Sequence, residues 1–301
     1  MNDEVEYQIR ELCSLLYLKK GVILGITSFF LVVAFTTLQF LKKEYRSDVL
    51  LAPVSAEKNS GLSSLANKIG GIASLAGTDL GDAKGIDKTT MALEIMRSRR
   101  FTIWFLNKYN LKRYLLLNGE WDNDKREWSF DGQTEISEGD LKPYQVMALD
   151  VQAYNNFQDG LDIIVDKSSG IVTISYLNES PVFAKQWLSL YIKEINEYML
   201  RMDISEAEES IEFLTNRLSS TSLNDLRQIF YGLIAEQTKT IMLANSRKEY
   251  VLKVLDPPLE ANYPFYPRTK IIISLAGFFG IVVALLYIYL EKAFRNQGEI
   301  K

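Results

Sequence analysis

Histidine is absent from this chain of 301 residues, and Cys13 is its only cysteine. A Ser-His-Asp triad, an HExxH zinc site, a four-cysteine zinc site and an internal disulfide are therefore excluded. The sequence also lacks a basic excess, because 34 Lys and Arg are set against 38 Asp and Glu, for a net charge of −4. Binding to a phosphate backbone needs clustered positive charge, so the composition argues against nucleic acid as a partner.

Phosphate-binding loops are lacking as well. No glycine is followed by lysine, and no G-x-G-x-x-G occurs, so neither a Walker A loop nor a dinucleotide fingerprint is present. Asp122 and Asp124 lack the glycine and the later glutamate of a calcium loop. The carboxylates Glu206, Glu208, Glu209 and Glu212 are better explained as a solvated helix face than as an acid–base pair. The sequence thus predicts no enzyme, with no catalytic residues, no cofactor and no metal.

Two long uncharged apolar runs, Gly21–Leu41 and Ile271–Leu290, are the most prominent features that are present. Each is long enough to cross a bilayer core of about 30 Å as a helix. The first run is too long for the apolar part of a signal peptide, and no small-residue cleavage site follows it. The predicted organisation is a tail 1–20, a span 21–41, a loop 42–270, a span 271–290 and a tail 291–301.

Charge bias does not orient these spans. The tails carry six Lys and Arg, and loop residues within about 15 positions of a span carry five. Long loops are translocated largely regardless of charge, so the preferred topology has both tails inside and the loop outside.

The loop shows strand and helix patterns in turn. Runs of β-branched and apolar residues predict strands, and periodic apolar residues predict helices. The predicted strands are Tyr45–Leu51, Leu161–Val165, Ile171–Tyr176 and Tyr250–Leu255; the predicted helices before residue 180 are Asp87–Tyr109 and Leu141–Phe157. A hairpin is predicted where Asn118-Gly119 separates Tyr114–Leu117 from Glu120-Trp121.

Two further segments of the loop leave alternatives open. Trp121 and Trp128 flank a very polar stretch, and their rings either contact a saccharide or pack the hairpin onto the domain. Ser60–Gly85 holds six of the 17 glycines, and it is either a mobile segment that contacts lipid or polymer or an adaptable surface loop.

A long helical region follows Ser180-Pro181, a pair typical of an N-cap and a first helical position. An apolar stripe at helical spacing consists of Leu188, Ile192, Ile195, Met199 and Met202. Ser222 can cap a second helix with Asp225 as its acidic partner. A helix of about 37 residues would be roughly 55 Å long, more than a compact domain needs, so we expect this region to project. The stripes serve either an intramolecular core or contacts between protomers.

The residues that approach and form the second span resemble those of the Wzz-type chain-length determinants, which are polysaccharide co-polymerases. The resemblance runs through Ala235–Lys239, Leu243-Ala244 and Glu249–Val251 to Asp256-Pro257-Pro258. Pro258 matches the first proline of the family signature, and Ala261 stands at the second, with Pro264 nearby. Tyr266-Pro267-Arg268 replaces Ser-Pro-Lys, Gly280 falls at the first helix glycine and Ala284 at the second. Gly277 and Gly280 would also let another helix approach closely in lipid.

The resemblance implies an α+β fold, in which two transmembrane helices flank a periplasmic mixed α/β base with a long protruding helical region. It also implies a bacterial inner-membrane homo-oligomer, in the form of a ring or bell, with both termini cytoplasmic. Such a protein regulates polysaccharide chain length, here of lipopolysaccharide O antigen, together with a Wzy-type polymerase and the growing undecaprenyl-linked glycan. The expected site is a set of residues for helix packing or polymerase contact in and before the second span: Pro258, Pro264, Pro267, Arg268, Gly277, Gly280 and Ala284. The alternative is a periplasmic sensor or adaptor anchored by the same two helices in membrane lipid.

Overall fold

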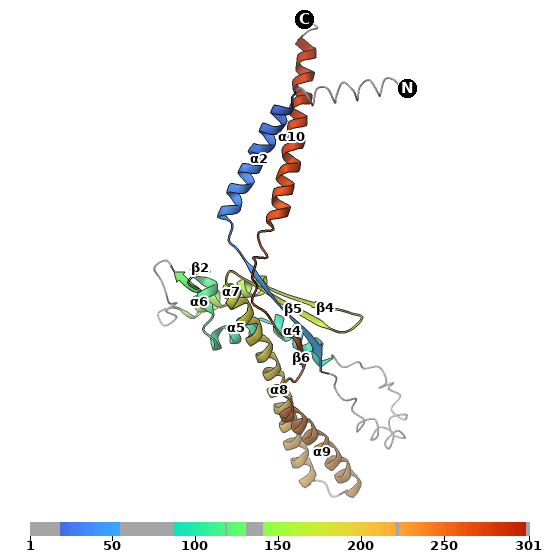
Figure 1. Ribbon diagram of the computed structural model, residues 1–301. Helices are drawn as coiled ribbons and strands as arrows, with labels where there is room; N and C mark the ends of the chain where they lie inside the picture. The colour runs from blue at the N-terminus through green and yellow to red at the C-terminus, as the bar shows by residue number, and fades with distance from the viewer. Residues whose placement is uncertain (1–18, 55–86, 118, 131–140, 221–222, 299–301) are drawn as a thin grey trace, which may run out of the picture. The chain divides into compact units, whose positions relative to one another are not determined.

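A computed structural model describes residues 19–54, 87–117, 119–130, 141–220 and 223–298 (Figure 1). The chain divides into two compact units. The first unit contains the residues up to Glu44 together with those from Tyr263 onward, and the second unit runs from Tyr45 to Asn262. The predicted Ser60–Gly85 segment, Cys13 and the Ser222 cap lie outside the described residues.

The first unit contains two apolar helices, α2 (Lys20–Phe40) and α10 (Thr269–Gly298), which lie side by side (Figure 1). Both are long and apolar enough to cross a membrane. Only 6% of the apolar window of α2 and 17% of that of α10 are buried, so neither is the core helix of a globular unit. Lys19 pairs with Glu291, which joins the start of α2 to the later part of α10. The helices therefore run antiparallel.

The second unit is built on a four-stranded antiparallel sheet with the order β4-β5-β1-β6. Its strands are β1 (Tyr45–Pro53), β4 (Leu161–Val165), β5 (Val172–Asn178) and β6 (Leu252–Asp256). Alternate residues of β1, from Tyr45 to Leu51, are buried, as expected for a sheet that faces the core on one side. These four strands confirm the strand predictions to within two residues at each end.

Helices α4 (Lys88–Arg97), α5 (Arg99–Lys108), α6 (Lys112–Leu116) and α7 (Pro143–Gly160) complete the base together with the first half of α8 (Pro181–Ser220). Aromatic rings form much of this core: Phe105 lies 4.8 Å from Tyr191, and Phe157 lies 4.9 Å from Tyr176, between ring centroids. The fold class predicted from the sequence, an α+β base with a long helical region and two terminal apolar helices, is confirmed.

The long helix α8 (Pro181–Ser220) has 40 residues and is thus about 60 Å long. Ser180 Oγ accepts the backbone N–H of Phe183 at 3.2 Å, so the predicted N-terminal cap is correct. All of its buried residues except Ala207 lie at or before Met199. The second half packs instead along α9 (Asn224–Ser246), where Ala207 of α8 and Ala244 of α9 are buried (Figure 1).

Two of the local predictions are wrong. The helix predicted over Asp87–Tyr109 is interrupted at Ser98, which takes an extended conformation and caps α5 by accepting the N–H of Phe101. The hairpin is displaced along the chain, because its strands are β2 (Gly119–Asp122) and β3 (Glu127–Phe130) and Gly119 lies within a strand. Asp122 Oδ1 accepts the N–H groups of Asp124 and Lys125, so this Asp-led stretch supplies the turn.

Candidate functional site

The two apolar helices approach each other closely at Gly280. A Cβ at this position would lie 2.9 Å from the Cα of Thr27 and 3.4 Å from the Cβ of Phe30, so only glycine fits without a shift. Ala284, one turn later, is fully buried. By contrast, a Cβ at Gly277 would have nothing within 4 Å. Of the three small residues, Gly280 and Ala284 are therefore covered within the chain, whereas Gly277 has open space beside it.

The predicted proline-rich segment is divided between the two units. Pro258 is buried in the second unit, next to Leu259, whose carbonyl accepts the Ser47 hydroxyl at 2.7 Å. Pro264 is exposed and Pro267 half-buried in the first unit, and the peptide bond between Tyr266 and Pro267 is cis.

The chain segments just outside α2 and α10 pair with each other. Glu44 donates its N–H to the carbonyl of Tyr266 at 3.1 Å and accepts the N–H of Phe265 at 2.7 Å. The guanidinium of Arg268 lies 4.9 Å from the Phe265 ring centroid and 5.6 Å from that of Tyr266. The backbone pairing joins the end of α2 to the start of α10. The cation of Arg268 lies over two aromatic rings directly before α10.

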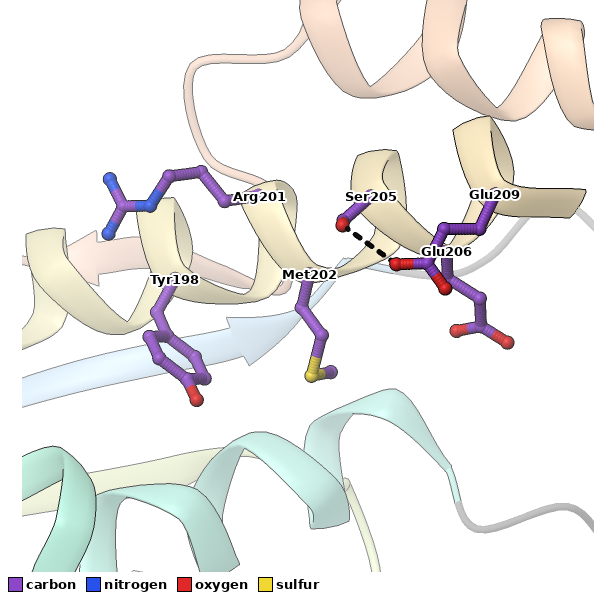
Figure 2. A pocket seen from close by; sticks show the side chains of 6 residues that line it. All are labelled: Tyr198, Arg201, Met202, Ser205, Glu206 and Glu209. Carbon is purple, nitrogen blue, oxygen red and sulfur yellow. Dashed lines mark hydrogen bonds between the residues drawn. The ribbon is translucent and has the colours of Figure 1, made fainter. Parts of the chain in front are cut away.

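An open pocket of about 410 Å³ lies against the middle of α8 (Figure 2). Its lining consists of one cation, two carboxylates, one hydroxyl and two larger side chains: Arg201, Glu206, Glu209, Ser205, Tyr198 and Met202. Arg201 lies over the ring of Trp104 at 5.7 Å, and its Nη1 is 3.5 Å from a carboxylate oxygen of Glu197. The four glutamates predicted to form a solvated face are all exposed, and no cluster of three or more potential metal ligands exists among the described residues.

Glu194 is a buried carboxylate that pattern reasoning missed. Its Oε1 accepts hydrogen bonds from Lys108 Nζ and Tyr109 Oη, both at 2.6 Å, whereas Oε2 has no partner. Burial raises the pKa of this carboxyl, but the hydrogen bonds from Lys108 and Tyr109 and the nearby positive charge outweigh it and lower the pKa below its usual range. The available signal was its spacing: Glu194 lies three residues after buried Tyr191 and four before Tyr198.

The same network acts on Tyr109. Burial, the hydrogen bond to Glu194 and the negative charge of Glu194 raise the pKa of Tyr109 to about 12. The phenol therefore stays protonated and works as a donor to the buried carboxylate. This arrangement connects α5 to α8 and has the character of a structural ion pair.

No family model matches the chain, and no curated protein matches it. Among solved structures, a full-length bacterial polysaccharide co-polymerase matches with a TM-score of 0.39 and 14% identity, over 94% of this chain and 97% of that one. A fragment of WzzB, a polysaccharide co-polymerase from Salmonella Typhimurium, matches with a TM-score of 0.30 and 12% identity, over 75% of this chain and 100% of the fragment. Both of these proteins are co-polymerases, the class that the residues around the second span resemble.

Proposed function

We propose that this chain is a non-catalytic co-polymerase that regulates polysaccharide chain length. The observation that carries the proposal is the packing of two apolar helices at Gly280 and Thr27, with a base and a 40-residue helix in the sequence between them. A regulator of this kind needs membrane anchors and an extended surface rather than a reactive centre. The resemblance of the second span and its lead-in to Wzz-type proteins supports the same function.

The proposed location is the bacterial inner membrane. Residues 1–20 and 291–301 would be cytoplasmic tails, and residues 42–270 would be periplasmic. The ion pair between Lys19 and Glu291 supports a hairpin of spans with both ends on one side. The substrate would be an undecaprenyl-linked glycan, with lipopolysaccharide O antigen as the proposed product.

The proposed assembly is a homo-oligomer, in the form of a ring or bell. Large apolar side chains stay exposed on α8 and α9 of a single chain, among them Phe213 at 57% and Met242 at 67% exposure. Exposed apolar groups gathered on two packed helices favour burial against another protein surface. Contacts between protomers would cover them.

The proposed contact with a Wzy-type polymerase lies in the membrane. Gly280 and Ala284 are occupied by α2, so Gly277 is the small residue of α10 at which a helix of the polymerase could approach closely. Pro264, Pro267 and Arg268 would position the start of α10 for that contact.

The test is the surface-polysaccharide ladder of cells with the gene intact, deleted and restored. We expect deletion to turn a clustered length band into an unregulated spread while polymer continues to be made. Loss of all polymer would indicate a polymerase instead. An unchanged ladder, in cells without a second regulator, would contradict the proposal and favour the sensor or adaptor.

A further inference from the structure

The hairpin of β2 and β3, together with α6 and the first turn of α8, carries a cluster of partly exposed aromatic rings, which we call the aromatic hairpin. It consists of Tyr114, Trp121, Trp128, Phe130 and Phe183. Trp128 and Phe130 are stacked at 6.1 Å and 16°, and Trp121 meets Trp128 edge-on at 5.9 Å. A Cβ at Gly119 would lie 2.7 Å from the Phe130 ring and 2.9 Å from the Trp128 ring, so glycine is what lets the rings lie flat over β2.

Two hydrogen-bond donors in this cluster have no acceptor. Arg113 Nε and Trp128 Nε1 are buried and lack a partner. The Arg113 guanidinium lies over the rings of Tyr114 at 4.9 Å and Phe130 at 5.2 Å, and within the described residues it forms no ion pair or side-chain hydrogen bond. Unpaired buried donors are costly, and native structures rarely retain them without a role.

The turn of the hairpin is held firmly from two directions. Asn123 accepts the Trp121 Nε1–H at 2.8 Å and donates to Tyr45 Oη at 2.7 Å. Arg126 donates to Glu260 at 2.8 Å. A binding surface fixed in this way loses little conformational freedom when a ligand is bound.

We propose that the aromatic hairpin binds a saccharide segment. A sugar ring offers an apolar C–H face, which packs on aromatic rings, and hydroxyl or acidic oxygens, which accept from the guanidinium of the partly exposed Arg113. A purely apolar ligand such as an acyl chain would leave the charged guanidinium of Arg113 without an acceptor. The inference rests on the proposed function in that the saccharide would be a segment of the polymer whose length is regulated.

The experiment measures binding of polysaccharide, released by mild acid from the strain that carries this chain, to the full-length protein in nanodiscs. Calorimetry compares the wild-type chain with Arg113→Gln and Trp128→Phe, and dextran of equal size serves as a neutral reference. Trp104→Phe is the matched control, because Trp104 packs on Phe101 and Tyr198 outside the hairpin. We expect each hairpin variant to raise the Kd at least tenfold and the control to leave it unchanged. Arg113→Lys keeps the charge and the fold if Arg113→Gln is unstable, and we expect it to weaken binding by a smaller factor.

Three outcomes would overturn the inference: no binding by the wild-type chain, an unchanged Kd in the hairpin variants, or an equal loss in Trp104→Phe. Equal binding of dextran would also overturn it, because the site would then not distinguish the polymer. The deletion ladder keeps this result separate from the proposed function. If deletion changes the ladder but the hairpin variants bind polysaccharide as the wild type does, only the proposed saccharide site is contradicted. If the wild-type chain binds polysaccharide through the hairpin but deletion leaves the ladder unchanged, only the proposed length regulation is contradicted.

Discussion

The side-chain oxygen of Asn196 accepts a hydrogen bond from the backbone N–H of Val251 at 2.8 Å. The same oxygen accepts the N–H groups of Tyr250 and Leu252, and the amide nitrogen of Asn196 donates to the Leu252 carbonyl at 3.0 Å. One buried side chain of α8 therefore replaces several backbone bonds at the start of β6. It attaches the first half of α8 to the chain that enters β6.

Asn196→Leu should destabilise the fold strongly. The leucine is close in size but leaves three backbone donors without an acceptor, so we expect a loss of about 3 kcal/mol or more in the free energy of unfolding. Thermal unfolding of the full chain in detergent, followed by near-UV circular dichroism, measures this. Asn216→Leu makes the same change at an exposed position of α8 and should shift stability by no more than about 0.5 kcal/mol. Equal effects at the two positions would contradict the role of Asn196.

Gly280→Leu should separate the two apolar helices. The added side chain has no room beside Thr27, and forced overpacking costs about 1–3 kcal/mol. We expect a lower unfolding temperature and a shifted polysaccharide length distribution at normal protein levels. Gly277→Leu enters open space and should keep the unfolding temperature of the wild type. A length shift in Gly277→Leu alone would support the polymerase contact, and an unchanged length distribution in Gly280→Leu would count against the importance of this helix pair.

Lys108→Met should weaken the fold in a pH-dependent way. Lys108 is partly exposed, so we expect a loss of about 2 kcal/mol at neutral pH, below the usual cost of breaking a fully buried pair. The lowered pKa of Glu194 means that its stabilisation is present above the pKa of an unfolded carboxyl and is lost as the pH falls through the folded value. The difference between wild type and variant should therefore shrink in acid.

Unfolding curves between neutral and acidic pH check this prediction. Lys193→Met is the matched control, because Lys193 is exposed and its Nζ is 3.7 Å from Glu197, so its pair contributes about 0–0.5 kcal/mol. A wild-type advantage that stays constant down to strongly acidic pH would exclude ionised Glu194 as its source.

Phe213→Glu should weaken the association of chains. Phe213 is 57% exposed on α8, and burying such a side chain contributes about 1.5–3 kcal/mol. A charge there should raise the concentration needed for half-association at least tenfold, as measured by light scattering in detergent. Asn216→Glu adds the same charge at a polar exposed position and should leave the assembly intact. If the assembly of the Phe213→Glu variant has the same mass as that of the wild type, the protomer contact does not involve this part of α8.

Local chemistry made several elements predictable. Leu161–Val165 has the residue types of a strand, and Ser180-Pro181 starts α8 because a serine cap and a first-position proline satisfy the helix terminus without distant partners. The stripe from Leu188 to Met199 is buried as its spacing indicates. Each of these signals is complete within one helix or one strand.

Other features depended on partners far away in the sequence. The apolar residues 114–117 were expected to form a strand, yet α6 covers Lys112–Leu116 because two residues of α7 hold it: Lys112 pairs with Asp150, and Asn156 donates to the Leu115 carbonyl. Ser98 interrupts a pattern that looks continuously helical, since its extended backbone and its cap turn the chain between α4 and α5.

The sequence alone determined the two long apolar helices, because an uncharged run of 20 or so apolar residues is recognisable without any distant partner and is long enough to cross a bilayer. It also determined the α+β class and the start of the long helix. Only the tertiary structure decided which glycine of α10 packs against α2. Gly277 and Gly280 are the same residue type and differ only in the side of the helix on which they lie. Likewise, only the fold gave Glu194 its two donors and left Arg113 and Trp128 without acceptors, because hydrogen bonding between distant residues follows from where the chain brings them together.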